Sequence, residues 1–235
     1  MKGRCVFRGD CAKDEDGCLA VYQQLSANPT SISSANNNIA YGRLPGNKTT
    51  QADAIKAYVQ SRLRSKHETW IALPREHWPA AWHKKGYKKP MVKLIMALYG
   101  HPEAGAHWER HLTEKVVAMG GVELKAEHPS SFWFKDRKLL LTVYVDDLLL
   151  SGPAEAHDAF WAEFRKHVNI EDPTEIDRFL GRQHDNISLE LPVCDSESDD
   201  SEVDQTSAAS RLMTLVDGMA FNMEDYVQQT VQKYV

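Results

Sequence analysis

The chain has 235 residues, of which 42% are hydrophobic and 26% charged, the usage of an ordinary globular protein with a sizeable core. It opens without a signal peptide, and no stretch approaches the roughly 20 apolar residues of a membrane-spanning helix. Four cysteines do not make a disulfide scaffold at this length. We therefore expect a reduced, intracellular protein of the cytoplasm or nucleus, with no membrane partner.

The formal net charge of −5 hides an uneven distribution of charge along the chain. Residues 185–204 contain eight Asp and Glu residues and no Lys or Arg, so the remainder has 28 basic and 25 (33 minus 8) acidic residues. Because local fields decide association more than total charge does, nucleic acid stays a possible partner. One basic run either holds a phosphate backbone or is a solvated loop; it consists of Lys84, Lys85, Lys88, Lys89 and Lys93.

Turn residues and composition predict the elements of the first hundred residues. Residues 1–22 are predicted to be a pair of strands around a charged turn, and residues 24–50 a polar loop with one short helix. Residues 52–58 are predicted to form a strand that ends in a helical turn. Residues 74–90, rich in proline and lysine, are predicted to be irregular surface structure.

Apolar periodicity defines two helices and a strand pair in the middle of the chain. Pro102 suits the first turn of a helix that has apolar residues at i, i+4 and i+8 and stops at Gly120. Residues 131–145 are typical of strand, turn and strand. Residues 154–168 are predicted to form the second helix, with its aromatic residues on one face.

The last quarter of the chain mixes short strands with an acidic stretch. Residues 175–183 and 187–191 are predicted to be two short strands, and the acidic, serine-rich residues 192–208 a disordered insertion. A short helix is expected over residues 223–234. Strands and helices alternate irregularly, so the predicted class is α+β with a mainly antiparallel sheet.

Two adjacent carboxylates, Asp146 and Asp147, interrupt an apolar run that extends over residues 139–150. Burying an unpaired carboxylate is costly unless its charge is compensated. A tight hairpin with both acids at its tip lacks the Asn-Gly or Asp-Gly pair of an ordinary two-residue turn. Mg²⁺ prefers carboxylate oxygens, so a metal site is one interpretation. A solvent-exposed hairpin tip is the other, and these residues alone do not separate the two.

Tyr-X-Asp-Asp between apolar strands, here residues 144–147, resembles the signature of reverse transcriptases. Residues 97–100 (Ala-Leu-Tyr-Gly), with Trp108 eight residues on, are similar to the segment Ala-Leu-Tyr-Gly-Leu-Lys-Gln-Ala-Pro-Arg-Ala-Trp of copia-type LTR retrotransposon polymerases. Residues 179–181 resemble that family's segment after the catalytic hairpin, and residues 3–9 resemble one of its fingers strands. These matches occur in the order of the family.

The resemblance implies a right-hand polymerase palm, an antiparallel sheet with packed helices, accompanied by partial fingers and a remnant thumb. Residues 1–191 would be fingers and palm, residues 192–208 an acidic insertion, and residues 209–235 a remnant thumb or helical tail. The implied activity is that of an RNA-directed DNA polymerase, which transfers a nucleotide from a dNTP to a primer 3′-hydroxyl on an RNA or DNA template.

The resemblance also assigns the residues of a catalytic site. It requires an upstream carboxylate with an aromatic residue five positions later, and Asp53 and Tyr58 supply both; the alternative for Asp53 is a helix cap or an exposed acid. Asp53 and Asp146 would then bind two Mg²⁺ or Mn²⁺ ions, supported by Asp147 and the carbonyl of Ala54. Tyr58 takes the place of the family's sugar gate, whose ring leaves no room for a ribose 2′-hydroxyl.

Other residues are assigned to substrates in the same way. Arg4 and Arg8 are candidates to hold the triphosphate, because guanidinium matches phosphate geometry, although each is equally plausible as a surface arginine. Tyr99 and Gly100 would line the nucleotide pocket. The residues expected to contact nucleic acid are Tyr144, Lys84, Lys85, Lys88 and Lys89.

Residues 101–105 depart from the family, because His-Pro-Glu-Ala-Gly replaces Leu-Lys-Gln-Ala-Pro and so removes a lysine and a glutamine. With the short fingers and thumb, this keeps open a catalytically inactive retroelement remnant that at most binds nucleic acid. A third hypothesis is a zinc hydrolase, because His107 and His111 lie one helical turn apart, although Glu109 is one place late for His-Glu-X-X-His. The sequence does not predict an oligomeric state.

Overall fold

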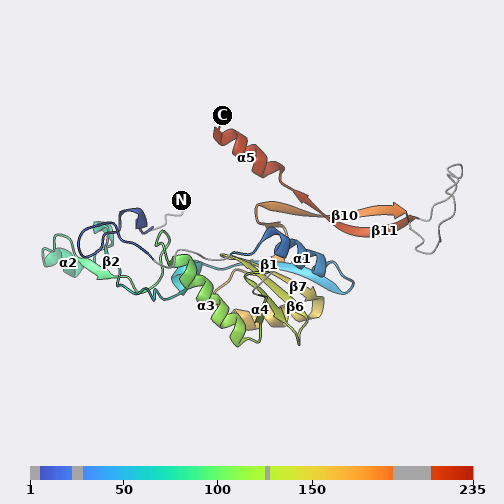
Figure 1. Ribbon diagram of the computed structural model, residues 1–235, viewed down its shortest axis with the longest axis horizontal. Helices are drawn as coiled ribbons and strands as arrows, with labels where there is room; N and C mark the ends of the chain where they lie inside the picture. Colours follow the sequence, from blue (N-terminus) through green and yellow to red (C-terminus); the bar gives the residue numbers. More distant parts are fainter. Residues whose placement is uncertain (1–5, 23–28, 125–127, 193–212, 235) are drawn as a thin grey trace.

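The computed structural model describes residues 6–22, 29–124, 128–192 and 213–234, and its largest unit is a six-stranded sheet (Figure 1). The strand order is β4-β5-β6-β7-β1-β8, and every neighbouring pair is antiparallel. The strands are β1 Asn47–Asp53, β4 Val122–Glu123, β5 Ser131–Phe134, β6 Leu139–Tyr144, β7 Asp147–Pro153 and β8 Thr174–Glu175. The predicted α+β class with a mainly antiparallel sheet is confirmed.

Strand β7 lies inside the sheet and is covered on both faces. Leu148, Leu149 and Leu150 are all fully buried, and successive side chains of a strand point to opposite faces. Leu148 and Leu150 belong to the core formed with α3 (Ala104–Ala118) and α4 (His157–Phe164). Leu149 packs instead with residues of α1 (Ile32–Gly42). An unbroken leucine run therefore marks a strand buried on both faces rather than a half-exposed strand.

Helix α1 is held on the sheet by polar contacts as well as apolar ones. The Nδ2 group of the buried Asn38 donates hydrogen bonds to the Leu140 carbonyl (3.0 Å), Thr142 Oγ1 (2.8 Å) and the Leu149 carbonyl (3.2 Å). At the helix start Ser31 Oγ accepts the Ser34 N–H, as an N-cap residue does. The polar stretch predicted to be mostly loop therefore contains a helix of 11 residues, fixed by tertiary hydrogen bonds.

The second helical layer is joined to the sheet through a buried histidine. Trp161 Nε1 donates to Thr50 Oγ1 (2.9 Å), and that hydroxyl donates to His157 Nδ1 (2.8 Å). Nε2 of His157 in turn donates to the Gly152 carbonyl (3.2 Å). Because the Gly152 carbonyl only accepts, Nε2 carries the proton of a neutral His157, and Nδ1 then accepts from the Thr50 hydroxyl. Burial, the largest cause, lowers the pKa of His157.

We expect the free energy of unfolding to fall as the pH is lowered below about 6.5, the ordinary pKa of histidine. The folded chain holds His157 below that value, so between the two pKa values the unfolded chain binds more protons and stability decreases with falling pH. One such group contributes at most about 1.4 kcal/mol per pH unit. Urea unfolding between pH 5 and 8 should show a shallower dependence for His157→Gln.

The exposed His167 provides the matched control, since His167→Gln should leave the pH dependence of stability as in the wild type. Burial also lowers the pKa values of four other histidines, namely His101, His107, His111 and His184. His157→Gln should therefore remove only part of the pH dependence of the free energy of unfolding. Equal slopes for His157→Gln and the wild type would contradict this account.

Segments that flank α1 and β1 in the chain form a smaller unit at one end of the molecule (Figure 1). Its elements are η1 Gly9–Cys11, η2 Ala57–Gln60, β2 Trp70–Ala72, η3 Arg75–His77, α2 Ala80–Lys84 and β3 Met91–Lys93, with β2 and β3 paired antiparallel. The strand pair predicted within residues 1–22 is wrong for the described part. Residues 6–22 contain only an isolated bridge, Lys13 with Leu19, because the Asp14 carboxylate accepts two backbone N–H groups and closes a compact turn.

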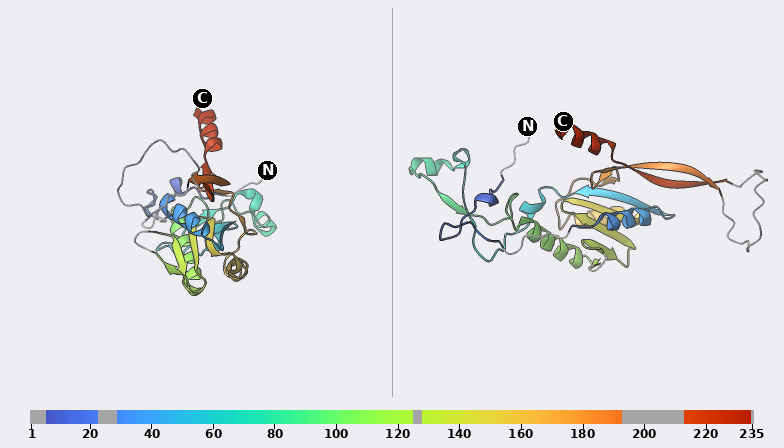
Figure 2. Two further views of the ribbon diagram at one scale, coloured as in Figure 1. Left: turned by 90° about the vertical axis from the view of Figure 1, so that its right-hand side faces the viewer. Right: turned by 45° about the horizontal axis from the view of Figure 1, so that its top comes forward.

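The chain ends in a long hairpin and a helix that project from the sheet (Figures 1 and 2). The hairpin pairs β10 (Arg182–Pro192) with β11 (Met213–Asn222), and β9 (Arg178–Phe179) extends it to three strands. The two short strands expected at 175–191 are thus one long strand preceded by shorter ones, and β11 is not predicted by the sequence. Helix α5 (Glu224–Tyr234) confirms the final predicted helix.

Two further expectations concern disorder in the acidic stretch and the absence of a membrane-spanning helix. Disorder was predicted over residues 192–208, and from residue 193 onward this stretch lies outside the described residues. Among the helices that the structure describes, none is both long enough and apolar enough to cross a membrane.

Candidate active site

The turn between β6 and β7 has an unusual backbone. Tyr144 pairs with Asp147, so Val145 and Asp146 are the two residues of the turn. Val145 has a φ of 57°, whereas Asp146 keeps a negative φ. A positive φ at the first central position alone is the pattern of a type II′ turn, which normally uses glycine there. A β-branched residue in this conformation is strained, and strain of this kind collects at functional sites.

The pairing of β1 with β7 brings a third carboxylate to this turn. Asp53, the last residue of β1, lies opposite Asp147, the first residue of β7. The next peptide N–H, that of Ala54, donates to the Asp146 carbonyl at 2.7 Å. The carboxyl groups of Asp53 and Asp147 lie close enough for each to shift the pKa of the other. Residues far apart in the sequence therefore converge at one edge of the sheet.

The convergence of acids disfavours ionisation of Asp53 and Asp147. Burial, followed by the charges of Asp146 and Asp53, raises the pKa of Asp147 to about 6. The pKa of Asp53 is also raised, by burial first and then by the charges of Glu171 and Asp146. Within the described residues, none of the three aspartates forms an ion pair with Lys or Arg. The carboxylates repel one another without a compensating basic side chain, a situation that a cation relieves.

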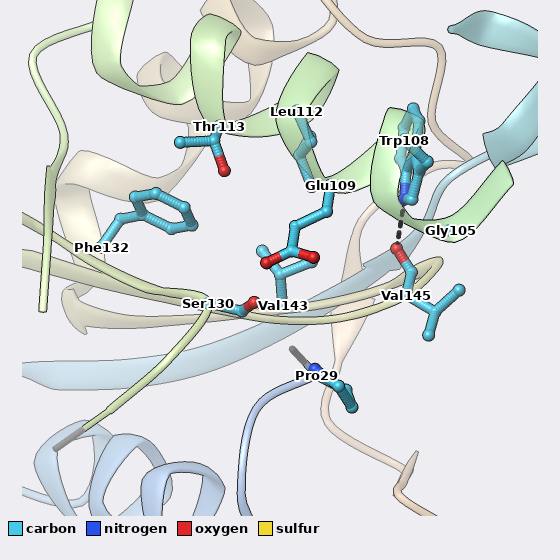
Figure 3. A pocket seen from close by; sticks show the side chains of 10 residues that line it. All are labelled: Pro29, Gly105, Trp108, Glu109, Leu112, Thr113, Ser130, Phe132, Val143 and Val145. Carbon is cyan, nitrogen blue, oxygen red and sulfur yellow. Dashed lines mark hydrogen bonds between the residues drawn. The ribbon is translucent and has the colours of Figure 1, made fainter. Parts of the chain in front are cut away.

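Helix α3 fixes the turn from its other side. Nε1 of Trp108 donates to the Val145 carbonyl at 2.6 Å, shown as a dashed line in Figure 3. Trp108 is only 2% exposed, so its indole ring is held by the core. Both carbonyls of the two-residue turn therefore have a donor, Val145 from Trp108 and Asp146 from Ala54. These two bonds fix the turn and the direction in which it presents Asp146.

A small, mainly apolar cavity of about 20 Å³ lies beside this contact, between α3 and the β5–β6 face of the sheet (Figure 3). In Figure 3 the carboxylate of Glu109 points into the space beside Val143, while Trp108 turns toward Val145. The cavity is lined by Pro29, Gly105, Trp108, Glu109, Leu112, Thr113, Ser130, Phe132, Val143 and Val145. Val145 therefore borders this cavity as well as forming the turn.

The residues assigned to the nucleotide pocket are also close to one another. The rings of Tyr58 and Tyr99 lie 4.7 Å apart between centroids. Burial, then the negative charge of Asp146, raises the pKa of Tyr58, which places its ring within electrostatic reach of the turn. Gly100 has a φ of 87°, and a Cβ atom there would lie 2.0 Å from the Phe7 carbonyl, so only glycine fits.

Other predicted site residues are not gathered at the carboxylates. Arg4 lies outside the described residues, and Arg8 is exposed and forms an ion pair with Asp10 at 2.8 Å. Tyr144, by contrast, does lie at the carboxylates: it pairs with Asp147 at the end of β6 and is 37% exposed. The lysines are exposed on and after α2, in the unit at the far end of the molecule (Figure 1); they are Lys84, Lys85, Lys88 and Lys89.

The donor set of the three aspartates fits a hard divalent cation. Carboxylate and carbonyl oxygens are the ligands of Mg²⁺, and strand pairing sets Asp53 opposite Asp147, where each raised pKa reports a need for compensating positive charge. In the described part of the chain, no three His, Cys, Asp or Glu side chains are arranged so that together they hold a metal ion. Binding would therefore bring the exposed Asp146 carboxylate toward the other two.

The histidines of α3 have separate partners. His107 is buried, with Nε2 3.4 Å from Ser65 Oγ and 3.8 Å from a carboxylate oxygen of Glu103. The ring of His111 lies against Trp108, with centroids 6.0 Å apart. These contacts account for both side chains as parts of the packing between α3 and its neighbours.

Glu171 is a member of the acidic group that sequence patterns miss. Its N–H donates to the Asp53 carbonyl at 2.9 Å, and its charge raises the pKa of Asp53. No local signal marks it, because only the return of the chain after α4 brings it beside β1. The geometry of the site is the evidence for its chemistry, since no protein-family model matches the chain.

Proposed function

We propose that this chain is an RNA-directed DNA polymerase domain resembling copia-type reverse transcriptases, which transfers a nucleotide from a dNTP to a primer 3′-hydroxyl. One observation carries the proposal: the β1–β7 register sets Asp53 opposite Asp147, beside the strained turn that presents Asp146. An ordinary hairpin tip needs neither a β-branched residue in the left-handed region nor a third carboxylate from another strand.

The proposed roles follow from where the side chains lie. Asp53, Asp146 and Asp147, with the carbonyl of Ala54, would hold Mg²⁺ or Mn²⁺ ions. When bound, such ions would supply Lewis acidity to the attacking hydroxyl and neutralise the leaving pyrophosphate. Tyr58, supported by Tyr99, would pack against the sugar and exclude a 2′-hydroxyl. The chain's own contribution is then mainly positioning, which is a large part of phosphoryl-transfer catalysis.

Primer extension tests the activity directly. The full chain is incubated with poly(rA)/oligo(dT), dTTP and Mg²⁺ or Mn²⁺, and product length is measured on a gel. We expect extension that EDTA abolishes and that Asp146→Asn lacks although it stays folded. Absence of extension by the folded wild type would refute the polymerase proposal, and persistence in Asp146→Asn would place the site elsewhere.

We expect Mg²⁺ to raise the melting temperature of the wild type in the absence of nucleic acid. An ion that binds only the folded state stabilises it by about 1.4 kcal/mol at ten times its dissociation constant. Relief of repulsion among the three aspartates is part of this binding free energy. Differential scanning fluorimetry with and without Mg²⁺ measures the shift, which should be absent in Asp146→Asn. An equal shift in both proteins would show that Mg²⁺ binds at another place.

A non-catalytic chain that binds nucleic acid is the second candidate. It is favoured by Glu103, which replaces the family's glutamine and is buried with one carboxylate oxygen lacking a hydrogen-bond partner. Arg8, a candidate for the triphosphate, is paired with Asp10 instead. Binding of poly(rA)/oligo(dT) without extension, under conditions where Mg²⁺ binds, would favour this candidate over the polymerase.

A further inference from the structure

The unit that carries α2 contains a group of aromatic side chains surrounded by basic ones. Trp78 and Trp82 lie 6.4 Å apart between ring centroids, Trp82 and Tyr87 lie 6.4 Å apart, and Trp78 and His83 lie 5.5 Å apart. The guanidinium of Arg75 lies 5.5 Å from the centroid of Trp78. These contacts form a continuous aromatic surface at the end of the molecule remote from the hairpin (Figure 1).

Backbone and indole hydrogen bonds hold this surface in shape. The segment leaves β2 and returns as β3, which are paired to each other, so its two ends are fixed. Nε1 of Trp78 donates to the Leu73 carbonyl at 2.8 Å, and the Tyr87 N–H donates to the Trp82 carbonyl at 3.4 Å. The rings are therefore positioned before any partner binds, which lowers the entropic cost of binding.

The aromatic residues border a hollow that is open to solvent. Its volume is about 440 Å³, within the usual range of small-molecule sites, and its lining includes Arg75, Trp78, His83, Tyr87 and Lys88. Tyr87 is 45% exposed, so one ring of the surface is accessible for stacking. A lining of aromatic rings with cationic side chains suits a flat, anionic partner better than an apolar one.

The local charge is opposite to that of the whole chain. Residues 73–89 contain five Lys and Arg residues and a single acidic residue, Glu76, whereas the chain has a net charge of −5. Four lysines of this segment are exposed, and one of them, Lys88, lines the hollow; the four are Lys84, Lys85, Lys88 and Lys89. A positive groove with accessible aromatic rings is how proteins bind single-stranded nucleic acid, with phosphates on the cations and unpaired bases on the rings.

We propose that the hollow of residues 73–89 binds an unpaired segment of RNA or DNA by stacking a base on Tyr87 and holding phosphates on the adjacent lysines. The inference rests on the proposed function only in taking nucleic acid as the partner. It goes beyond the proposed polymerase activity in two ways. It assigns base stacking to residues 73–89, and it predicts a preference for single strands, because the bases of a duplex are not available for stacking on aromatic rings.

Fluorescence anisotropy of labelled oligonucleotides tests the stacking. The full chain is titrated with oligo(dT) and with a chain of abasic spacers that has the same number of phosphates. We expect oligo(dT) to bind about tenfold more tightly, and Tyr87→Leu to remove that preference. Tyr226→Leu, which alters an exposed tyrosine on α5, should keep it. Equal binding of both probes by the wild type would overturn the proposal.

Salt dependence tests the role of the lysines. Each phosphate held on a single strand contributes about −0.7 to the slope of log K against log salt. The double variant Lys85→Ala/Lys88→Ala should therefore reduce the magnitude of the slope by about 1.4, whereas the exposed pair Lys135→Ala/Lys166→Ala should not. If polyglutamate competes as well as oligo(dT) does, the hollow binds acidic chains of any kind and the stacking proposal is wrong.

The stacking proposal and the polymerase proposal can fail independently of each other. Preferential binding of oligo(dT) that depends on Tyr87, without primer extension, would keep the stacking site and refute catalysis. Primer extension by a wild type whose oligo(dT) affinity is unchanged by Tyr87→Leu would do the reverse. Melting temperatures of Tyr87→Leu and Lys85→Ala/Lys88→Ala within a few degrees of the wild type establish that the variants are folded.

Discussion

Asp53→Asn is expected to lower the turnover number of primer extension by about a thousandfold at saturating dNTP, because electrostatic groups that act on the transition state contribute on this scale. Asp53 is the carboxylate that strand pairing sets against Asp147. Asparagine keeps the size and the carbonyl oxygen of the side chain but removes the negative charge. The same change should leave the melting temperature unchanged or raise it, since it relieves repulsion among the acids.

Single-turnover extension measured by rapid quench gives the rate, and fluorimetry gives the melting temperature. Asp136→Asn, in the exposed turn between β5 and β6, is the matched control and should keep full activity. A rate for Asp53→Asn within tenfold of the wild type would mean that Asp53 has no part in the chemistry. A large fall in melting temperature would instead assign Asp53 a structural role.

Local patterns predict the parts of this site whose signals lie within one element. The apolar run interrupted by two acids predicts the hairpin, and the i, i+4, i+8 spacing predicts α3, which the structure places at Ala104–Ala118. The register between β1 and β7 is different in kind. A shift by one residue would turn Asp53 to the other face of the sheet, and only packing on both faces excludes it.

Elements whose stability comes from distant partners escape sequence patterns. Helix α1 is rich in serine and asparagine, which favour loops in isolation, and its hydrogen bonds from Asn38 go to carbonyls and a hydroxyl on β6 and β7. Strand β11 is fixed by its pairing with β10 across a long intervening stretch. Neither partner can be identified from the residues of the element itself.

Trp108 shows how one residue can be predicted for one role and missed for another. Its spacing predicts a buried position on α3, and its 2% exposure confirms that prediction. Its hydrogen bond to the Val145 carbonyl depends on how α3 crosses the end of the sheet, which no periodicity specifies. The bond makes Trp108 a positioning residue for the turn that carries Asp146, and this role has a measurable consequence.

Trp108→Phe is expected to lower the turnover number about tenfold while the KM for dNTP changes little. The substitution keeps a buried aromatic ring but leaves the Val145 carbonyl without its donor, a loss of about 1–3 kcal/mol for a buried group. Val145 is strained at a φ of 57°, so an untethered turn relaxes toward a conformation in which Asp146 is displaced. Steady-state extension with varied dTTP separates the two kinetic constants.

Two further variants distinguish positioning from general packing. Trp133→Phe, on β5 and remote from the turn, should lower stability without a selective fall in the turnover number. Val145→Gly removes the strain, so Trp108→Phe should cost less stability in a Val145→Gly background than in the wild type, giving a coupling energy between the two positions. Additive effects of Trp108→Phe and Val145→Gly on stability and turnover would show that the indole does not act through the turn.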